Sequence, residues 1–281
     1  MAENRVAIVT GAGGMRGIGR AIALRYARQG LKLALVDVPR SKDQIPPAEI
    51  EAGWRDIESV AEEVGKLGSK AICVYADIAN EQDVETACQR TIAAFGQIDV
   101  LVNNARAGIG RDRALAIDLD PAEWDRVMRV NARGTFLFAR TVARHMVARG
   151  GPGHIINMSS QSGKRGLAMH SAYVASKFAV NGLTQCLAIE LGKYNINVNA
   201  ICPGVVNTGR YSLEETLAAE SAGISLDEVA HARFEKHKQK VILPRIAVAD
   251  DIAGVAAFLI SPDAVHITGQ SLNVCGGESF H

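Results

Sequence analysis

Three residues that can hold and pass a proton stand close together near the middle of the chain. Tyr173 and Lys177 are four residues apart, so on a helix they lie one turn apart on the same face. Ser160 comes thirteen residues before Tyr173, after the apolar run Ile155–Met158, which predicts a strand. A strand that ends at this serine, followed by a short loop and a helix, would bring a hydroxyl, a phenol and an ammonium group together. The stretch is a candidate catalytic site, although a tyrosine and a lysine at this spacing often form just a surface cation–aromatic contact.

A glycine-rich stretch near the N-terminus lies between a predicted strand, Val6–Val9, and a predicted helix, Ala21–Arg28. The loop between them reads TGAGGMRGIGR. Strand, glycine loop and helix in this order favour phosphate binding, because glycine lets the backbone approach a pyrophosphate and the helix N-terminus offers free N–H groups. A lone glycine loop would be a weak signal, since tight turns also use glycine.

The next apolar run, Leu31–Val36, ends at Asp37. A carboxylate at this place is positioned to accept the ribose hydroxyls of NAD and to repel the extra phosphate of NADP. Arg16 in the glycine loop instead favours NADP, because a basic residue there could pair with that phosphate. We give Asp37 more weight, so the sequence favours NAD and leaves NADP open.

The composition bounds the class of protein. The chain has 281 residues, with 31 basic and 30 acidic side chains, and this balance argues against nucleic acid or an anionic membrane as the main partner. The first apolar run is too short for a signal peptide, and no later run approaches a membrane span. The five cysteines form no C-x-x-C pair and the seven histidines show no metal-binding spacing, so we expect a cytoplasmic protein with reduced thiols and no metal site.

Strands and helices alternate along the whole chain without an internal repeat. This alternation predicts one α/β domain, residues 1–281, with a doubly wound sheet. Two segments are longer than simple connections require. Residues of about 40–55, with the pair Pro46-Pro47, read as an inserted surface loop, and the polar, helical stretch of about 208–243 reads as a lid over the substrate.

Taken together, the motifs resemble the short-chain dehydrogenase/reductase family over essentially the whole chain. The resemblance rests on residues in the family's order: Thr10-Gly11 with Gly17-Ile18-Gly19, Asp77, Asn103-Asn104-Ala105, Asn131, Ser160, Tyr173 with Lys177, the run Pro203–Thr208 and the run Ile267–Gln270. It implies a Rossmann fold with a seven-stranded parallel sheet and helices on both faces. It also implies a homotetramer or homodimer that interconverts a secondary alcohol and a ketone with NAD(P).

The resemblance also implies roles for single residues. Tyr173 would be the general acid/base, Ser160 would hold the substrate oxygen, and Asn131 would anchor a water in a proton relay from Lys177. A free phenol ionises near pH 10, so work near neutrality needs a cation such as Lys177 to favour the phenolate. The cofactor would be bound by Gly11, Arg16, Gly17, Ile18, Gly19, Asp37, Asp77, Ile78, Asn104, Ala105, Tyr173, Lys177, Pro203, Gly204, Val206 and Thr208.

The substrate is the least determined part. Besides Ser160 and Tyr173, we expect Gln161, His170 and Tyr211 to contact it. Arg106 and Arg165 could bind a carboxylate or phosphate, or could simply face solvent.

The chain departs from the family pattern in four places. The span from Gly11 to Gly17 is six positions where the family typically has four, and the loop after Asp37 is long. Arg106 stands where glycine is customary, and Cys275 stands where aspartate usually precedes the final Gly-Gly. The first two departures concern cofactor specificity and exchange.

Three alternatives stay open. The first is a 3-oxoacyl carrier-protein reductase that uses NADPH, which Asp37 and the near-zero net charge disfavour. The second is a dehydrogenase whose tightly held NAD is recycled by a separate redox partner. The third is a non-catalytic NAD-binding protein of the same fold, which the intact Ser160, Tyr173 and Lys177 disfavour.

Overall fold

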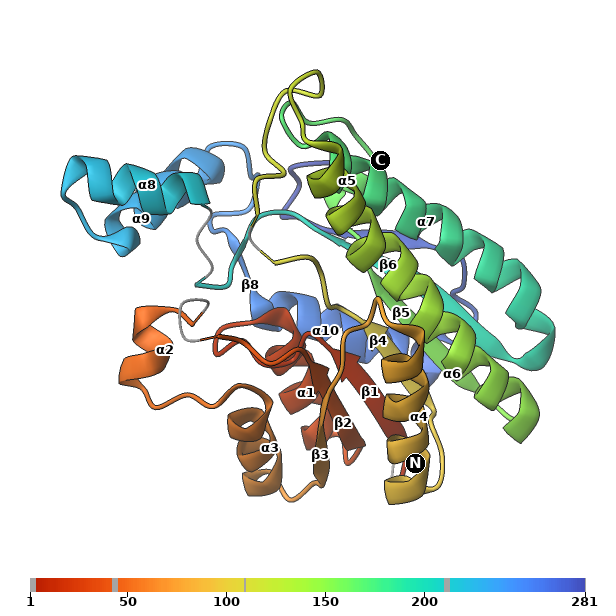
Figure 1. Cartoon of the computed structure of the whole chain (residues 1–281). Coiled ribbons are helices and arrows are strands. Elements are labelled where there is room, and N and C mark those ends of the chain that lie inside the picture. The colour runs from red at the N-terminus through yellow and green to blue at the C-terminus, as the bar shows by residue number, and fades with distance from the viewer. Residues whose placement is uncertain (1–3, 42–44, 109, 210–212, 281) are drawn as a thin grey trace.

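A seven-stranded parallel sheet forms the centre of the molecule (Figure 1). The computed structural model describes residues 4–41, 45–108, 110–209 and 213–280. The strands lie in the order β3-β2-β1-β4-β5-β6-β9, and every neighbouring pair is parallel. This is the doubly wound Rossmann arrangement expected from the sequence. The strands are β1 (Val6–Thr10), β2 (Lys32–Asp37), β3 (Ala71–Tyr75), β4 (Val100–Asn103), β5 (Gly153–Met158), β6 (Ile196–Pro203) and β9 (Ser271–Val274).

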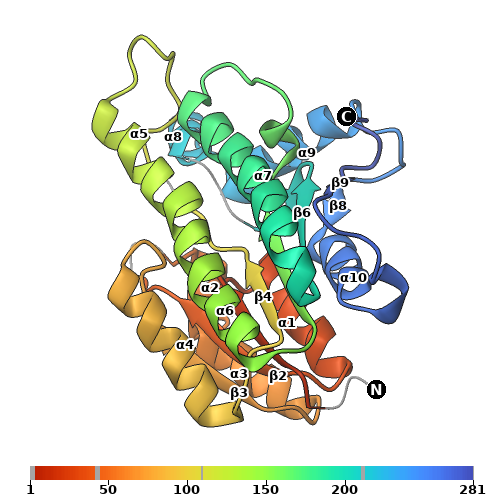
Figure 2. The same cartoon turned by 90° about the vertical axis from the view of Figure 1, so that its right-hand side faces the viewer.

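Helices cover both faces of the sheet (Figure 2). One face packs against α1 (Ile18–Arg28), α3 (Asp56–Lys66) and α10 (Ala249–Leu259), and the other against α4 (Glu81–Phe95), α6 (Thr135–Arg149) and α7 (Ser171–Leu191). Successive residues of β1 point to opposite faces, so Ala7 and Val9 enter the first core and Ile8 enters the second. Both faces being buried explains why β1 is apolar throughout instead of alternating.

The long helix expected from Pro121 to about Ala148 contains a wider turn. It begins as α5 (Pro121–Met128), where Asp120 caps the N-terminus by accepting a hydrogen bond from the backbone N–H of Ala122. Residues Arg129–Gly134 then form a π-helical turn before α6 continues. Such turns are rare and often lie at functional sites. This one carries Asn131.

The two long segments fold into structures of their own. The insert after β2 includes α2 (Pro47–Glu51), and the lid contains α8 (Leu213–Ala222) and α9 (Leu226–Lys238), which project away from the sheet in Figure 1. A second, two-stranded sheet of β7 (Val206–Asn207) and β8 (Ala247–Val248) joins the two ends of the lid. Short 3-10 helices occupy Gln161–Gly163, Gly192–Tyr194 and Pro262–Ala264. Among the described residues, no helix is both long and apolar enough to cross a bilayer.

Candidate active site

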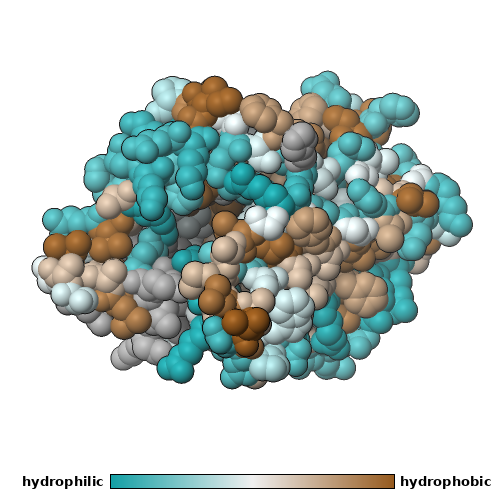
Figure 3. Space-filling view, turned by 90° about the horizontal axis from the view of Figure 1, so that it is seen from above, coloured by the Kyte–Doolittle hydropathy of each residue, from teal (hydrophilic) through white to brown (hydrophobic). Residues whose placement is uncertain are grey.

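The candidate catalytic residues meet where β5 ends and α7 begins, at the carboxyl end of the sheet. Tyr173 lies in the first turn of α7 and Lys177 in the second. The Lys177 ammonium is 5.7 Å from the centre of the Tyr173 ring and donates a 2.8 Å hydrogen bond to the carbonyl of Met158, the last residue of β5. The helix and the strand are therefore joined through Lys177 itself. Figure 3 looks onto this end of the molecule, where the surface is hollowed and hydrophilic and hydrophobic side chains meet.

On spacing alone, Ser159 and Ser162 compete with Ser160 for the catalytic role, and the hydrogen bonds distinguish Ser159 from Ser160. Ser159 donates its hydroxyl to the carbonyl of Lys177 at 3.1 Å, so it fastens α7 to the end of β5. Ser160 instead accepts a 3.1 Å bond from the backbone N–H of Ser162, and this bond does not use its own proton. The Ser160 hydroxyl can still donate to a substrate oxygen. This supports the choice of Ser160.

Lys177 is buried, with 3 % of its surface exposed. Burial lowers its pKa to about 7, and the charge of Arg106 acts in the same direction. Close to neutral pH the side chain therefore exchanges readily between ammonium and amine. A group poised in this way can receive and release a proton within the range where most enzymes work.

The side chain of Asn131 makes one hydrogen bond at each end of its amide. Its Oδ1 accepts a 2.8 Å bond from the backbone N–H of Ala107, and its Nδ2 donates a 3.0 Å bond to the hydroxyl of Ser176 on α7. Its backbone carbonyl accepts the hydroxyl of Thr135 at 2.7 Å. Asn131 therefore holds the loop after β4, the π-helical turn and α7 in one arrangement. These bonds use one N–H and one oxygen lone pair of the amide, and the anchoring of a relay water by Asn131 stays a prediction.

Two expected substrate contacts lie beside these residues and the third lies outside the described residues. Gln161 directly follows Ser160 and is buried, while His170 immediately precedes α7. The Nδ1 atom of His170 is 2.8 Å from the carbonyl oxygen of Ala168. Because a carbonyl can only accept a hydrogen bond, Nδ1 carries the proton in this contact and Nε2 is left as an acceptor. Tyr211 is not among the residues that the structure describes.

The glycine loop has the tight geometry that a dinucleotide site requires. Gly11 has a φ of +67°, and a Cβ there would lie 2.7 Å from the Cα of Ala105. A Cβ on Gly19 would collide with the carbonyl of Gly11. The first turn of α1 has neither a capping side chain nor an acidic residue, so its backbone N–H groups and positive dipole end are left for an anion. These features fit the pyrophosphate of a nicotinamide dinucleotide.

Hydrogen bonds with Asn104 and Ala105, which follow β4, hold the start of this loop. The Asn104 side chain donates to the carbonyls of Thr10 and Gly11, both at 2.9 Å. The Thr10 hydroxyl in turn accepts from the backbone N–H groups of Asn104 and Ala105, both at 3.0 Å. β1 and β4 are thereby locked together at the point where the cofactor would lie. The amide of Asn104 thus builds the cradle.

Asp37 lies at the tip of β2, as expected, and points into the glycine loop. Its Oδ2 accepts a 2.8 Å bond from the backbone N–H of Gly13, and its Oδ1 accepts from that of Val38. Burial raises the pKa of this carboxyl, while these N–H groups and Arg40 oppose the rise. The remaining lone pairs of the two oxygens are available for ribose hydroxyls.

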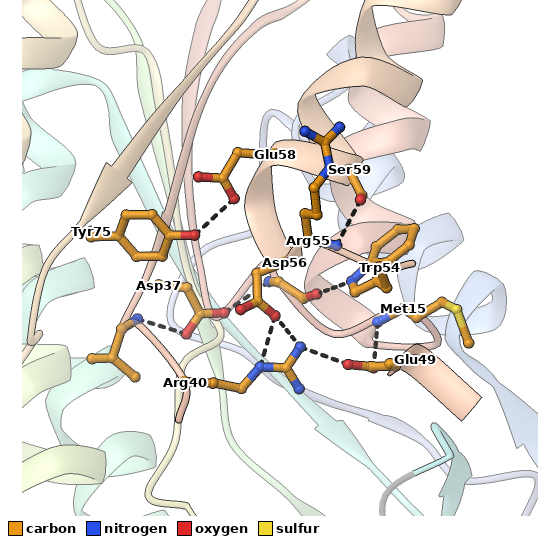
Figure 4. A network of polar contacts seen from close by, with 12 residues as sticks. Met15, Asp37, Arg40, Glu49, Trp54, Arg55, Asp56, Glu58, Ser59 and Tyr75 are labelled. Atoms are coloured by element: carbon orange, nitrogen blue, oxygen red, sulfur yellow. Dashed lines mark hydrogen bonds and ion pairs between the residues drawn. The ribbon is translucent and has the colours of Figure 1, made fainter. Parts of the chain in front are cut away.

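The insert is more than the surface loop expected from its sequence, because it packs against the glycine loop (Figure 4). Glu49 on α2 is buried and accepts a 2.9 Å bond from the backbone N–H of Met15, and the Trp54 indole donates to the carbonyl of Gly13 at 2.6 Å. Arg40 lies between Glu49 and Asp56 and forms ion pairs with both. No local pattern predicts these contacts, since the partners are separated by up to 41 residues.

The remaining expected cofactor contacts lie around the same cleft. Asp77 pairs with Arg129 at 3.2 Å, and the buried Ile78 packs against Gly134 of the π-helical turn. At the other end, Pro203 closes β6 and a Cβ on Gly204 would lie 2.9 Å from that of Cys275. The other predicted contacts near this end are Val206, in β7, and Thr208, which follows it. Arg16 is exposed in the glycine loop, with its Cδ 3.1 Å from where a Cβ on Gly209 would lie.

A buried polar chain beneath the site was missed by the sequence reasoning. Asn103 donates to Asn157 at 2.9 Å, and Asn157 donates to Thr184 on α7 at the same distance. All three are buried and link β4, β5 and α7 across the core. An asparagine inside an otherwise apolar strand was the available signal, because a buried amide needs partners.

Comparison with known proteins agrees with this geometry. A family model described as enoyl-(acyl carrier protein) reductase matches residues 11–279. A protein from Armillaria gallica named as a short-chain dehydrogenase/reductase is 38 % identical over 280 residues, covering 100 % of this chain and 98 % of its own. The chain belongs to the short-chain dehydrogenases/reductases. As a member of that family it is an oxidoreductase of CH–OH groups that interconverts a secondary alcohol and a ketone with a nicotinamide dinucleotide.

Two further relatives show the range of this similarity. A sorbitol dehydrogenase from Cereibacter sphaeroides is 33 % identical over 279 residues, which is 98 % of each chain. The crystal structure of a levodione reductase superposes with a TM-score of 0.81 at 32 % identity, again over 98 % of both chains. The shared scaffold therefore serves substrates of quite different shape, and the substrate must be argued from this chain's own side chains.

Proposed function

We propose that this enzyme oxidises a secondary alcohol with NAD, and that Tyr173 is its general acid/base. The observation that carries the proposal is the buried Lys177 ammonium, which lies 5.7 Å from the centre of the Tyr173 ring where β5 ends and Ser160 follows. When bound, the dinucleotide supplies the hydride acceptor, nicotinamide C4. Tyr173 takes the hydroxyl proton of the alcohol, and Ser160 donates to the same oxygen and fixes its position. Lys177 favours the phenolate of Tyr173 and passes protons towards solvent.

The adenosine end supports NAD over NADP. Asp37 lies there, the insert adds Glu49, and α3 begins with Asp56. Arg40 pairs with Glu49 and Asp56, and its charge also acts on Asp37. Because Arg40 already pairs with two of them, it is poorly placed to bind a 2′-phosphate. Arg16, the other cation weighed for that role, lies beside Gly209 at the start of the lid. Its position suits the pyrophosphate better than the 2′ position of the ribose.

Substitution of Asp37 tests the preference for NAD. The ratio of kcat/KM for NAD to that for NADP is measured in the wild type, in Asp37→Ser and in Glu62→Gln, an exposed carboxylate of α3 paired with Arg55. Like charges in contact cost several kcal/mol, so Asp37→Ser is expected to lower the ratio about 100-fold and Glu62→Gln to leave it unchanged. A wild-type preference for NADPH would overturn the proposal. It would favour the carrier-protein reductase instead.

The contacts of the insert also support slow cofactor exchange. Trp54 and Glu49 hold the backbone of the glycine loop at Gly13 and Met15, so opening of the loop must break both bonds. We expect purified protein to retain some NAD(H), visible by absorbance in the supernatant after denaturation. Trp54→Phe removes one bond while keeping the ring, and it should speed release of NADH in a stopped-flow chase. An unchanged release rate would contradict this role of the insert.

We also propose a homodimer or homotetramer built on the outer faces of α6 and α7. These helices expose the apolar side chains Phe136, Phe178 and Ile189, of which Ile189 is 83 % exposed. Light scattering coupled to size exclusion gives the mass directly. Ile189→Glu should shift it towards the monomer, whereas a monomeric wild type would contradict the proposal.

A further inference from the structure

The last residues of the chain return to the active site and touch the end of the lid. After β9, the carbonyl of Gly276 accepts hydrogen bonds from the backbone N–H groups of Ile242 and Leu243, at 2.9 and 3.1 Å. Gly276 and Gly277 have φ values of +63° and +87°, and a Cβ on Gly277 would lie 2.9 Å from the Cδ1 of Ile242. The two glycines allow the tail to pass this close to the chain beyond α9.

Glu278 on this tail forms a closed ring of hydrogen bonds with Gln161 and Arg165. Gln161 Nε2 donates to Glu278 Oε2 at 3.0 Å, Arg165 donates to Glu278 Oε1 at 2.8 Å, and the same Arg165 nitrogen donates to Gln161 Oε1 at 3.0 Å. The Glu278 side chain is 5 % exposed, whereas that of Arg165 is 49 % exposed. The buried carboxylate is thus fixed at both oxygens, and its charge is balanced by the guanidinium.

This ring lies between two loops of the proposed site. Gln161 directly follows Ser160, which would hold the reacting oxygen. On the other side, Glu278 Oε2 is 3.4 Å from where a Cβ would lie on Gly204, one of the residues expected to bind the cofactor. A substrate at Ser160 whose next carbons extend between these two loops would have the amide of Gln161 and the carboxylate of Glu278 as their neighbours.

The hydrogen-bonding capacity of this pair suits a hydroxyl group. The amide of Gln161 has a second N–H that the ring does not use, and the carboxylate of Glu278 has further lone pairs. A hydroxyl can accept from the amide and donate to the carboxylate at once. A carboxylate of the substrate could not donate and would be repelled by Glu278. Arg165 would attract that substrate carboxylate only weakly, since the charge of Arg165 is already paired with Glu278.

We propose that Glu278 and Gln161 are specificity-determining residues that bind a second hydroxyl group of an uncharged diol or polyol and reject hydroxy acids. The inference rests on the proposed function, because it assumes that the reacting oxygen lies at Ser160. It assigns Arg165 the task of balancing Glu278, in place of the anion binding considered from the sequence.

Three four-carbon secondary alcohols test the proposal: 1,3-butanediol, 2-butanol and 3-hydroxybutyrate. They differ only in the terminal carbon two positions from the reacting one, which carries a hydroxyl, is a methyl group or is a carboxylate. The wild type should prefer the diol to 2-butanol and use the hydroxy acid least. Glu278→Gln keeps the shape of the side chain and removes its charge. It should lower the preference for the diol over 2-butanol about 10- to 100-fold, which is the value of one hydrogen bond to a charged group. It should also raise the rate with the hydroxy acid relative to that with 2-butanol. Glu62→Gln is the matched control and should change neither ratio. Unchanged ratios in Glu278→Gln would overturn the proposal.

A binding measurement keeps this proposal separate from the proposed function. With NAD at saturation, we expect erythritol to raise the Tm of the wild type and erythronate to leave it unchanged, and Glu278→Gln should gain a shift with erythronate. These shifts need no turnover, so an enzyme inactive on all three alcohols would contradict the proposed function alone. If Glu278→Gln does not fold, Gln161→Leu removes the amide and should likewise abolish the diol preference. Equal shifts with erythritol and erythronate in the wild type would refute the specificity.

Discussion

Replacement of Lys177 should change how stability depends on pH, and the sign and size of the change follow from its burial. In the unfolded chain the ammonium has its ordinary pKa of 10.5, whereas burial lowers that pKa to about 7 in the folded protein. Between these values the unfolded state holds a proton that the folded state has lost, so stability rises with pH. The slope is about 1.4 kcal/mol per pH unit, and the full difference is about 5 kcal/mol. Below pH 7 the folded protein carries the whole cost of a buried ammonium.

The assay compares urea unfolding of the wild type and Lys177→Met at pH 7, 8 and 9 and at one protein concentration. The difference in unfolding free energy between them should move in favour of the wild type by about 1.4 kcal/mol for each pH unit, while other titrating groups cancel in the comparison. Lys193→Met is the control, because Lys193 also lies over an aromatic ring, that of Tyr194, but is exposed. A difference that does not vary with pH would refute the link between burial and the proton affinity of Lys177.

Four other substitutions test the site directly. Tyr173→Phe should lower kcat about 10²- to 10⁴-fold while NADH binding, followed by fluorescence, stays within a factor of about two; unchanged turnover would refute the role of Tyr173 as general acid/base. Ser160→Ala should lower kcat with little change in Tm, whereas Ser159→Ala should lower Tm through loss of its bond to α7 and keep most of kcat, and the reverse pattern would exchange their roles. Gly19→Ala should abolish NADH binding in calorimetry, because its Cβ has no room against the carbonyl of Gly11; normal binding would contradict the assignment of the loop.

Local sequence signals were sufficient for most of the fold. Apolar runs without alternation identified buried strands such as β1, and the glycine loop lies between a strand and a helix as predicted. The spacing of Tyr173 and Lys177 correctly placed both on one helix, α7, because residues four apart share a helix face. These predictions succeed because each depends on neighbours along the chain.

The features that sequence reasoning missed depend on contacts between distant parts of the chain. Glu278 meets Gln161 across 117 positions, and nothing near either residue announces the pairing. The π-helical turn at Asn131 was also invisible, because an apolar pattern does not show which residue widens a turn. The role of the insert was missed because its prolines and mixed charge are typical of exposed loops, although Glu49 turns inward to bind the backbone at Met15.

The short β7–β8 pair has a consequence for how such an enzyme can change. Because Val206–Asn207 and Ala247–Val248 are hydrogen-bonded side by side, the chain that leaves the sheet for the lid returns to nearly the same point. The residues between them form a loop whose two ends meet, and the entropic cost of closing a loop grows only slowly with its length. The lid can therefore be shortened, extended or exchanged for that of a relative without disturbing the register of the central sheet. The range of substrates can therefore change through substitutions in this one segment, while the glycine loop and the Tyr173–Lys177 pair stay unaltered.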